Sequence, residues 1–431
     1  MSKRKTAVAV LLVALSCSAM AASTNRVCGY KWGEWTRVDS LEGSVTTNAY
    51  AMSMGVRNGK LGIAYAANKD QATQYAYGYY SEYAYRPESD RLLRQTVTNE
   101  DIPTSITMGT YNTCMHGLQF DSAGTPLFAM VRYGDNASIV TRTAPETYSN
   151  DNATNSGASV RYWGAVGNST FVLDAMDKPH YVWITGGTAV STQVIYGVKS
   201  GGVWSNMVLV ADIADTNMHE LGRPSLTLDS NDYPHVSYTG PDSYVFHAWQ
   251  DAGGTNLERL GRTGGSWPPP SSVIAMDTNG HPMVAYLEIY PPGPPTTRIV
   301  VEMFNGASWT TNAVISRPGA DFGFWGSKLV QDLKLDKAGQ PAIVVSYTDH
   351  ASGAAATFWI DFYTWDGSSW TGGHIGTFPN TPGCGQVSLV FDNAGRPFVG
   401  TVMELGGTAN KGVYILTTIP PPPAGTIFTV Q

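Results

Sequence analysis

The chain has 431 residues, of which 42% are hydrophobic and 14% charged, and it carries 46 glycines, 25 prolines, 23 tyrosines and 12 tryptophans. This composition predicts an all-β protein with short strands and many turns. The formal net charge is −7, and no Lys/Arg cluster follows the first five residues. Nucleic acid and anionic membrane surfaces are therefore unfavourable partners, because both need a basic footprint.

The N-terminus has the pattern of a secretory signal peptide. A basic run at residues 3–5 precedes an apolar stretch over residues 7–15, and residues 19–21 (Ala-Met-Ala) fit a cleavage site. The apolar stretch is too short for a transmembrane span, which needs about 20 residues. We expect residues 1–21 to be removed and the protein to be secreted, periplasmic or extracellular. A lipid anchor through Cys17 is the less favoured alternative.

An Asp-x-x-Gly-x-Pro phrase recurs along the chain, as in "LDKAGQPAIVVSYTD" from residue 335. Its first aspartates are Asp121, Asp174, Asp229, Asp277, Asp336 and Asp392. A degenerate seventh copy lies at residues 54–65, with Val56 in the place of the Asp and Leu61 in the place of the Pro. Repeats of 48 to 65 residues with several β-like segments each are typical of a propeller.

Each copy predicts four strands. Alternating apolar residues precede the Asp, a second strand follows the Pro, and a third strand runs through a hairpin into a fourth that begins near a Trp. Seven copies predict a single-domain, seven-bladed β-propeller of four-stranded antiparallel blades over residues 22–418. The last copy lacks the Trp-led strand, so we expect Trp35–Val38 to complete that blade and close the ring. Residues 419–431, a Pro-rich tail with one short strand, either add an outer strand or extend outward.

The repeated phrase is predicted to build turns. Asp accepts hydrogen bonds from backbone N–H groups, Gly takes a positive φ, and Pro fixes the entry into the next strand. A metal at each Asp is disfavoured, because one carboxylate cannot supply the six to eight oxygens that calcium needs. His180 and His235 follow the Pro of their copies and His281 precedes it, and all three are interpreted as structural, because a residue that recurs in register in a repeat usually belongs to the architecture. We expect no metal and no cofactor.

After signal removal Cys28, Cys114 and Cys384 are left, so at most one disulfide forms. Cys114–Cys384 is the better pair, because each residue lies seven or eight positions before an Asp of the phrase, near the expected channel mouth. The absence of a Cys-x-x-Cys motif or a Cys/His cluster argues against structural zinc.

Function is expected where the copies differ. In a four-stranded meander the loops between the second and third strands share one face, the top, with the connections between blades. That face collects unrepeated aromatic and polar residues suited to a sugar, whose C–H faces stack on aromatic rings and whose hydroxyls need hydrogen-bond partners. The ligand-binding candidates are Arg161, Trp163, Asn168, Arg223, Trp325 and Gln386. In the alternative interpretation these tryptophans cover blade edges and Arg223 bridges two blades.

The pattern "D-x-x-G-x-P-x-V-x-Y … W-D-G-x-x-W" resembles the repeats of secreted bacterial β-propellers of the sialidase-like, or BNR-repeat, superfamily, over about residues 30–418. The resemblance implies a propeller fold and a function among sialidases, other glycoside hydrolases, polysaccharide lyases and non-catalytic binding propellers. Two motifs differ from those of sialidases: Arg86-Pro87 lacks the Ile between them, and Asp366 is followed directly by Gly367.

Our prediction is a monomeric exported propeller that binds a glycan or protein ligand on its top face without catalysis. The alternative is a carbohydrate-active enzyme, either a polysaccharide lyase or a glycoside hydrolase. For a lyase, His116 or His219 would move the proton, with Arg223 and Tyr162 completing the catalytic candidates.

Overall fold

A computed structural model gives the fold. It describes residues 26–33, 35–40, 52–58, 60–66, 73–79, 98–102, 113–132, 137–153, 170–187, 190–213, 224–240, 243–263, 272–290, 296–318, 330–348, 357–378, 384–404 and 411–418. No helix within these ranges is long and apolar enough to span a membrane. The predicted signal peptide and the tail after Thr418 lie outside the described residues.

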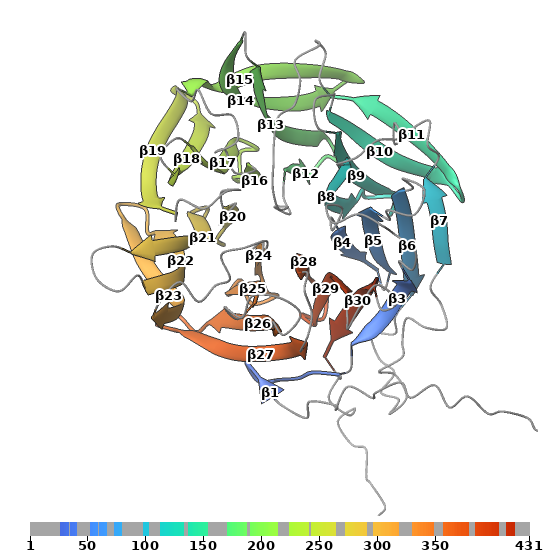
Figure 1. The fold of residues 1–431 in the computed structure, drawn as a ribbon. Coiled ribbons are helices and arrows are strands. Elements are labelled where there is room, and N and C mark those ends of the chain that lie inside the picture. The colour runs from blue at the N-terminus through green and yellow to red at the C-terminus, as the bar shows by residue number, and fades with distance from the viewer. Residues whose placement is uncertain are drawn as a thin grey trace, which may run out of the picture.

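The strands form seven four-stranded antiparallel sheets around a common centre (Figure 1). Six sheets use four consecutive strands each. The first sheet contains β4 (Met52–Arg57), β5 (Lys60–Ala66), β6 (Thr73–Tyr79) and β7 (Thr98–Ile102). The second contains β8 (Thr113–Phe120), β9 (Pro126–Arg132), β10 (Ala137–Ala144) and β11 (Thr147–Asn152). The third sheet contains β12 (Phe171–Leu173), β13 (Pro179–Gly187), β14 (Val190–Ser200) and β15 (Val203–Ile213). The fourth contains β16 (Ser225–Leu228), β17 (Pro234–Thr239), β18 (Tyr244–Asp251) and β19 (Gly254–Arg262).

Two further sheets follow the same order. The fifth sheet contains β20 (Val273–Met276), β21 (Pro282–Tyr290), β22 (Thr296–Phe304) and β23 (Trp309–Pro318). The sixth contains β24 (Val330–Leu335), β25 (Pro341–Thr348), β26 (Phe358–Trp365) and β27 (Trp370–Phe378). The remaining sheet combines β28 (Cys384–Phe391), β29 (Pro397–Glu404) and β30 (Lys411–Thr417) with the N-terminal β3 (Thr36–Ser40). The prediction of an all-β propeller with four-stranded antiparallel blades is confirmed.

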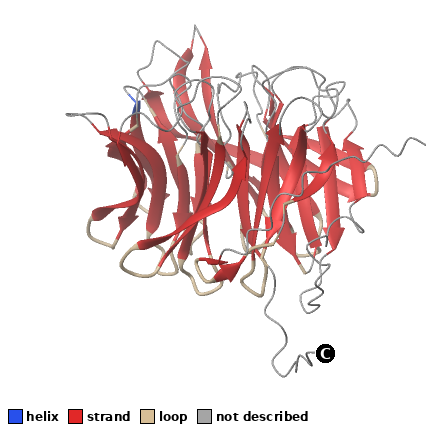
Figure 2. Ribbon diagram, turned by 60° about the horizontal axis from the view of Figure 1, so that its bottom comes forward, coloured by secondary structure: helices blue, strands red, loops and turns tan. Residues whose placement is uncertain are grey.

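The first strand of every sheet lies innermost and the last lies on the outer wall (Figure 1). Most of the described turns gather at one end of the strands (Figure 2). We call the opposite end the upper end. The repeated phrase connects the two inner strands of six sheets at the turn end, as its sequence predicts.

The structural role of the phrase is confirmed by its hydrogen bonds. Asp174 Oδ1 accepts from the backbone N–H groups of Met176 and Lys178, both at 2.8 Å. The same bonds recur at Asp229, Asp277, Asp336 and Asp392. At the Gly position φ is positive even where an Asp replaces the Gly: it is 61° at Asp177 and 62° at Asp232. The turn thus selects residues that tolerate this region.

The degenerate copy builds the equivalent hairpin with a shorter turn. Val56 pairs with Leu61 and Arg57 with Lys60. In the other copies the residue before the Asp pairs with the Pro, as Phe120 does with Pro126. The structural equivalent of the Asp is therefore Arg57 and not Val56, because a two-residue turn replaces the longer one. The Arg57 guanidinium donates to two carbonyls of the next sheet's turn, at 2.8 and 3.3 Å.

The N-terminal segment pairs with the last described strand of the chain. β3 pairs antiparallel with β30, so the prediction that the segment around Trp35–Val38 completes the last sheet is confirmed. A short hairpin of β1 (Arg26–Val27) and β2 (Tyr30–Lys31), which the sequence did not reveal, precedes it. Trp32 is 2% exposed, and its ring lies 5.1 Å from that of Phe362 in β26. The N-terminus is thereby anchored to two neighbouring sheets.

Hydrophobic clusters fill the spaces between adjacent sheets. One cluster joins β21, β22 and β23 to β24 and β25 through residues such as Val301 and Val345, both fully buried. The innermost strands come very close in one sector. A Cβ on Gly55 would lie 2.8 Å from the Leu118 carbonyl oxygen, and one on Gly117 would lie 2.7 Å from that of Phe171. Only glycine permits this approach of β4, β8 and β12.

Candidate functional site

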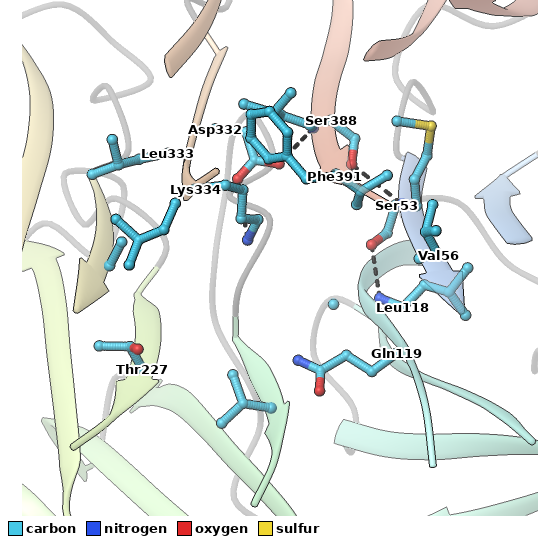
Figure 3. Close-up of a pocket in the computed structure, with 18 of the residues that line it drawn as sticks. Ser53, Val56, Leu118, Gln119, Thr227, Asp332, Leu333, Lys334, Ser388 and Phe391 are labelled. Carbon is cyan, nitrogen blue, oxygen red and sulfur yellow. Dashed lines mark hydrogen bonds and ion pairs between the residues drawn. The ribbon is translucent and has the colours of Figure 1, made fainter. Parts of the chain in front are cut away.

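The innermost strands surround a central channel of about 500 Å³ (Figure 3). Every one of the seven sheets contributes to its lining, from β4, β8, β12, β16, β20, β24 and β28. The polar side chains among the lining residues are Ser53, Gln119, Thr227, Asp332, Lys334 and Ser388. A concave site at the centre of a rigid ring is the part of this fold best suited to hold a ligand.

A repeated hydrogen bond ties the innermost strands together. The Ser53 hydroxyl accepts from Leu118 N–H at 2.7 Å, and the Ser388 hydroxyl accepts from Met54 N–H at 3.2 Å (Figure 3). Two more sheets repeat this bond: Ser225 Oγ accepts from Ile274 N–H at 3.2 Å, and Asp332 Oδ2 accepts from Leu389 N–H at 2.8 Å. In each case the side chain stands four positions before the Asp of the phrase, or before its equivalent Arg57.

Gly117 occupies this position in β8, so another residue makes the connection there. Gln119 Nε2 donates to the Phe171 carbonyl at 3.3 Å, and Gln119 Oε1 accepts from Leu173 N–H at 2.9 Å. Movement of one inner strand against the next would break these hydrogen bonds and leave a buried polar group without a partner, which is costly. The bonds therefore hold the channel wall rigid.

One charged pair lines the channel among the described residues. The Asp332 side chain is 1% exposed, and its Oδ1 lies 3.4 Å from Lys334 Nζ, which is 35% exposed on the side-chain scale. Both belong to β24, two residues apart, and therefore lie on the same face of the strand. Asp332 thus combines a structural bond to β28 with an ion pair whose cation reaches the channel.

The sequence-predicted site lies largely outside the described residues. Arg161, Tyr162, Trp163 and Asn168 fall in residues 154–169, His219 and Arg223 in 214–223, and Trp325 in 319–329. His116 and Gln386 are on described strands, but their side chains are not described. The roles predicted for these residues stay predictions, as does the Cys114–Cys384 pair.

The backbone nevertheless brings His116 and Gln386 to one level of the ring. His116 is two residues before Leu118, and Gln386 is two residues before Ser388, so both stand just above the bonds to β4. An irregularity interrupts each strand there, between His116 and Gln119 in β8 and between Cys384 and Val387 in β28. Extra residues of this kind re-aim side chains and are frequent beside active sites.

Two buried clusters of titratable residues were not predicted. His247 contacts His235, with 3.0 Å between ring nitrogens, and Glu258, with 2.8 Å between Nδ1 and Oε1. The interpretation of His235 as structural agrees with this burial, since the side chain is buried and is not among the residues that line the channel. Burial lowers the pKa of His247, and burial together with the His247 charge lowers that of His235 to about 4.

The second cluster surrounds Asp361, which is fully buried in β26. Its carboxylate accepts hydrogen bonds from Tyr347 and Tyr363, at 3.0 and 2.9 Å, and contacts His374 Nδ1. The only sequence signal was a single acid inside the apolar run "FWIDFY". Both clusters lie between sheets and away from the channel, and we assign them to packing between blades.

Within the described ranges, no group of three or more His, Cys, Asp or Glu side chains is placed to hold a metal ion. Cys28 is a free thiol whose Sγ lies 3.0 Å from the Thr371 carbonyl oxygen, and burial raises its pKa. The described residues therefore offer polar contacts in the channel.

No family model matches the sequence, and no curated protein matches it. Among solved structures the chain is similar to a PL25 ulvan lyase, described as a new family of polysaccharide lyase. The identity is 12% over 91% of this chain and 96% of that chain, with a TM-score of 0.55. The same values hold for that lyase bound to -[GlcA(1-4)Rha3S]-. The polysaccharide lyase Uly1 is 9% identical over 92% and 94% of the chains, with a TM-score of 0.48. At this identity the ulvan lyase likeness establishes a shared fold.

Proposed function

We propose that the protein is a carbohydrate-active enzyme that holds a polysaccharide over the upper end of the central channel, and that its reaction is that of a polysaccharide lyase. The observation that carries the proposal is the likeness along nearly the whole chain to a propeller lyase that binds a glycan. It supports the enzymatic alternative over a propeller that only binds its ligand.

The candidate residues suit an elimination reaction. A lyase neutralises the carboxylate of a uronate, removes the adjacent proton and returns a proton to the departing sugar oxygen. We assign neutralisation to Arg223 and proton transfer to His116 or His219 with Tyr162. The position of His116 beside the irregularity in β8, at the level where inner strands are joined, supports its place at the channel mouth.

We also propose that the seven four-stranded sheets are the complete set of blades and that β3 closes the ring. The pairing of β3 with β30, and the Met54–Ser388 and Leu118–Ser53 bonds on either side of β4, support this closure. Export through residues 1–21 and a monomeric state belong to the same proposal.

The test is to incubate the full mature chain with a panel of uronate-containing and neutral polysaccharides. Ultraviolet absorbance of unsaturated products detects a lyase, and a reducing-end assay detects hydrolysis. We expect unsaturated products from a uronate polymer, abolished by His116→Ala or His219→Ala. His281→Ala, in a turn at the opposite end, is the matched histidine control and should leave the rate unchanged.

Other outcomes would overturn the lyase assignment. Reducing ends without unsaturated products would indicate a hydrolase that uses loop carboxylates. Binding of a glycan without cleavage, lost in Trp163→Ala or Trp325→Ala, would return the protein to the class of binding propellers.

A further inference from the structure

The hydrogen bonds between innermost strands are not repeated at every interface of the ring. At four interfaces the acceptor stands four positions before the Asp of the phrase or its equivalent, and Gln119 connects the second sheet to the third. Two interfaces are left, between the third and fourth sheets and between the fifth and sixth. The residues at the acceptor position there are Thr170 and Val273.

Neither of these residues supplies the bond. Val273 has no polar atom in its side chain. Thr170 is fully buried, and its hydroxyl has no hydrogen-bond partner among the described residues. The N–H groups that stand three positions before the next Asp, as in the bonded interfaces, belong to Leu226 and Leu333. Each of them therefore lacks the side-chain acceptor that serves its counterparts in the other sheets.

Apolar packing holds these two interfaces. Leu226 and Tyr238 of the fourth sheet belong to one hydrophobic cluster with Val182 of the third. Val273 of the fifth sheet belongs to a cluster with Val345 of the sixth. Apolar packing is not directional and tolerates small sliding between packed elements, whereas a hydrogen bond is lost when its atoms move apart. Sliding here breaks no bond of the kind that joins the other inner strands.

The fourth and fifth sheets, which lie between these interfaces, are firmly connected to each other. In addition to the bond accepted by Ser225, the Ser272 hydroxyl donates to that of Ser237 at 3.0 Å. Farther out, the rings of His247 and Trp309 meet edge to face with 5.4 Å between centroids. The two sheets are therefore expected to behave as one rigid body.

The other five sheets form a second body. Inner-strand bonds connect the sixth sheet through the last, first and second sheets to the third. Ser122 N–H also donates to Asp177 at 2.8 Å, between turns of the second and third sheets. The N-terminal hairpin adds a connection, because Tyr30 packs edge to face on Phe362 of the sixth sheet and donates to the Gly395 carbonyl of the last at 3.4 Å.

We propose that the fourth and fifth sheets move as one body against the other five, by sliding at the two interfaces that lack an inner-strand bond, and that this movement opens and closes the central channel. The moving body contributes Leu226, Thr227, Ile274, Ala275 and Met276 to the channel lining, so its displacement changes the width of the channel. The movement is inferred from the hydrogen bonds and packing alone. The polysaccharide as the ligand that uses it rests on the proposed function.

The first test measures distances between spin labels by pulsed electron paramagnetic resonance. The labels are attached to a noncanonical amino acid in the full chain, so the native cysteines stay unchanged. They replace Ala123, Asn279 and Ala338, which are exposed and occupy the same turn position in the second, fifth and sixth sheets. Positions 123 and 279, like positions 123 and 338, lie in sheets three steps apart on the ring, and only the first pair spans the two bodies (Figure 1).

We expect a broad or two-peaked distance distribution for positions 123 and 279 and a single narrow one for positions 123 and 338. Distributions of equal width would overturn the proposal. Because both pairs share one label and the same kind of turn, motion of the label itself contributes equally to each.

The second test restores the missing bond. Val273→Thr supplies an acceptor with nearly the same side-chain shape. Exchange of the Leu333 N–H with deuterium should become about 2- to 10-fold slower, the effect of one hydrogen bond. The distribution for positions 123 and 279 should become narrower. Thr170→Val is the matched control, because it removes a hydroxyl that bonds to no described residue, and it should change neither measurement.

Two outcomes of the second test would contradict the proposal. An unchanged exchange rate in Val273→Thr would mean that the N–H of Leu333 is not open to this position. Slower exchange with an unchanged distance distribution would mean that the missing bond does not govern movement. A protein that moves as expected but cleaves no polysaccharide would reject the proposed activity and leave the movement in place.

Discussion

The stacked histidines between two sheets predict that the protein loses stability in mild acid. His235 is 9% exposed, its ring stacks on that of His247 at 5.2 Å between centroids, and His247 stacks on Trp249 at 4.7 Å. Burial, with a smaller effect of the His247 charge, lowers the pKa of His235 from 6.5 to about 4. Protonation therefore opposes packing between these blades.

The sign and size follow from proton linkage. Between the two pKa values the unfolded chain binds a proton at His235 and the folded chain does not, so unfolding becomes more favourable as the pH falls. The stability contributed by neutral His235 is fully present above pH 6.5 and is lost as the pH falls toward 4. The loss amounts to about 2 kcal/mol at pH ~5 and approaches about 3 kcal/mol near pH ~4.

The assay is denaturant unfolding, followed by tryptophan fluorescence, over a pH series from neutral to mildly acidic. His235→Gln removes the titrating group, so its free energy of unfolding should fall less steeply with pH than that of the wild type. Val236→Ala, which removes buried volume from the same strand, should lower stability and keep the wild-type slope. Equal slopes for His235→Gln and the wild type would refute the reasoning.

Three further substitutions test contacts between adjacent blades by the same unfolding measurement. Ser53→Ala leaves a buried N–H of β8 without its acceptor and should cost about 1–3 kcal/mol, whereas unchanged stability would mean that the bond is dispensable. Gly117→Ala combines a φ of 55° with a backbone oxygen 2.7 Å from the new Cβ, so it should destabilise more than Gly124→Ala, where φ is 82° but the space is open. Equal effects would show that the close approach of the inner strands relaxes easily. Trp32→Ala empties a buried site beside Phe362 and should cost about 3–5 kcal/mol, and a loss below about 1 kcal/mol would mean that the N-terminal anchor is marginal.

The blade architecture could be predicted from the sequence because it depends on interactions between residues close in the chain. The aspartate turns recur because each needs a side-chain acceptor and a residue tolerant of positive φ, and both requirements are met within six consecutive residues. The absence of a fourth strand in the last copy, and its presence at the N-terminus, indicated the pairing of β3 with β30. The degenerate copy was aligned one residue out of place. Its turn is shorter than in the other copies, and the sequence alone does not show where the missing residues fall.

The functional features required the tertiary structure. Ser53 and Leu118 are 65 residues apart, and Asp332 and Leu389 are 57 apart, so no local pattern identifies their bonds. A repeat determines what each blade is, because turns and strands are decided by near neighbours. What the blades enclose or present together depends on register and on contacts between distant segments, which only the closed packing of the sheets decides.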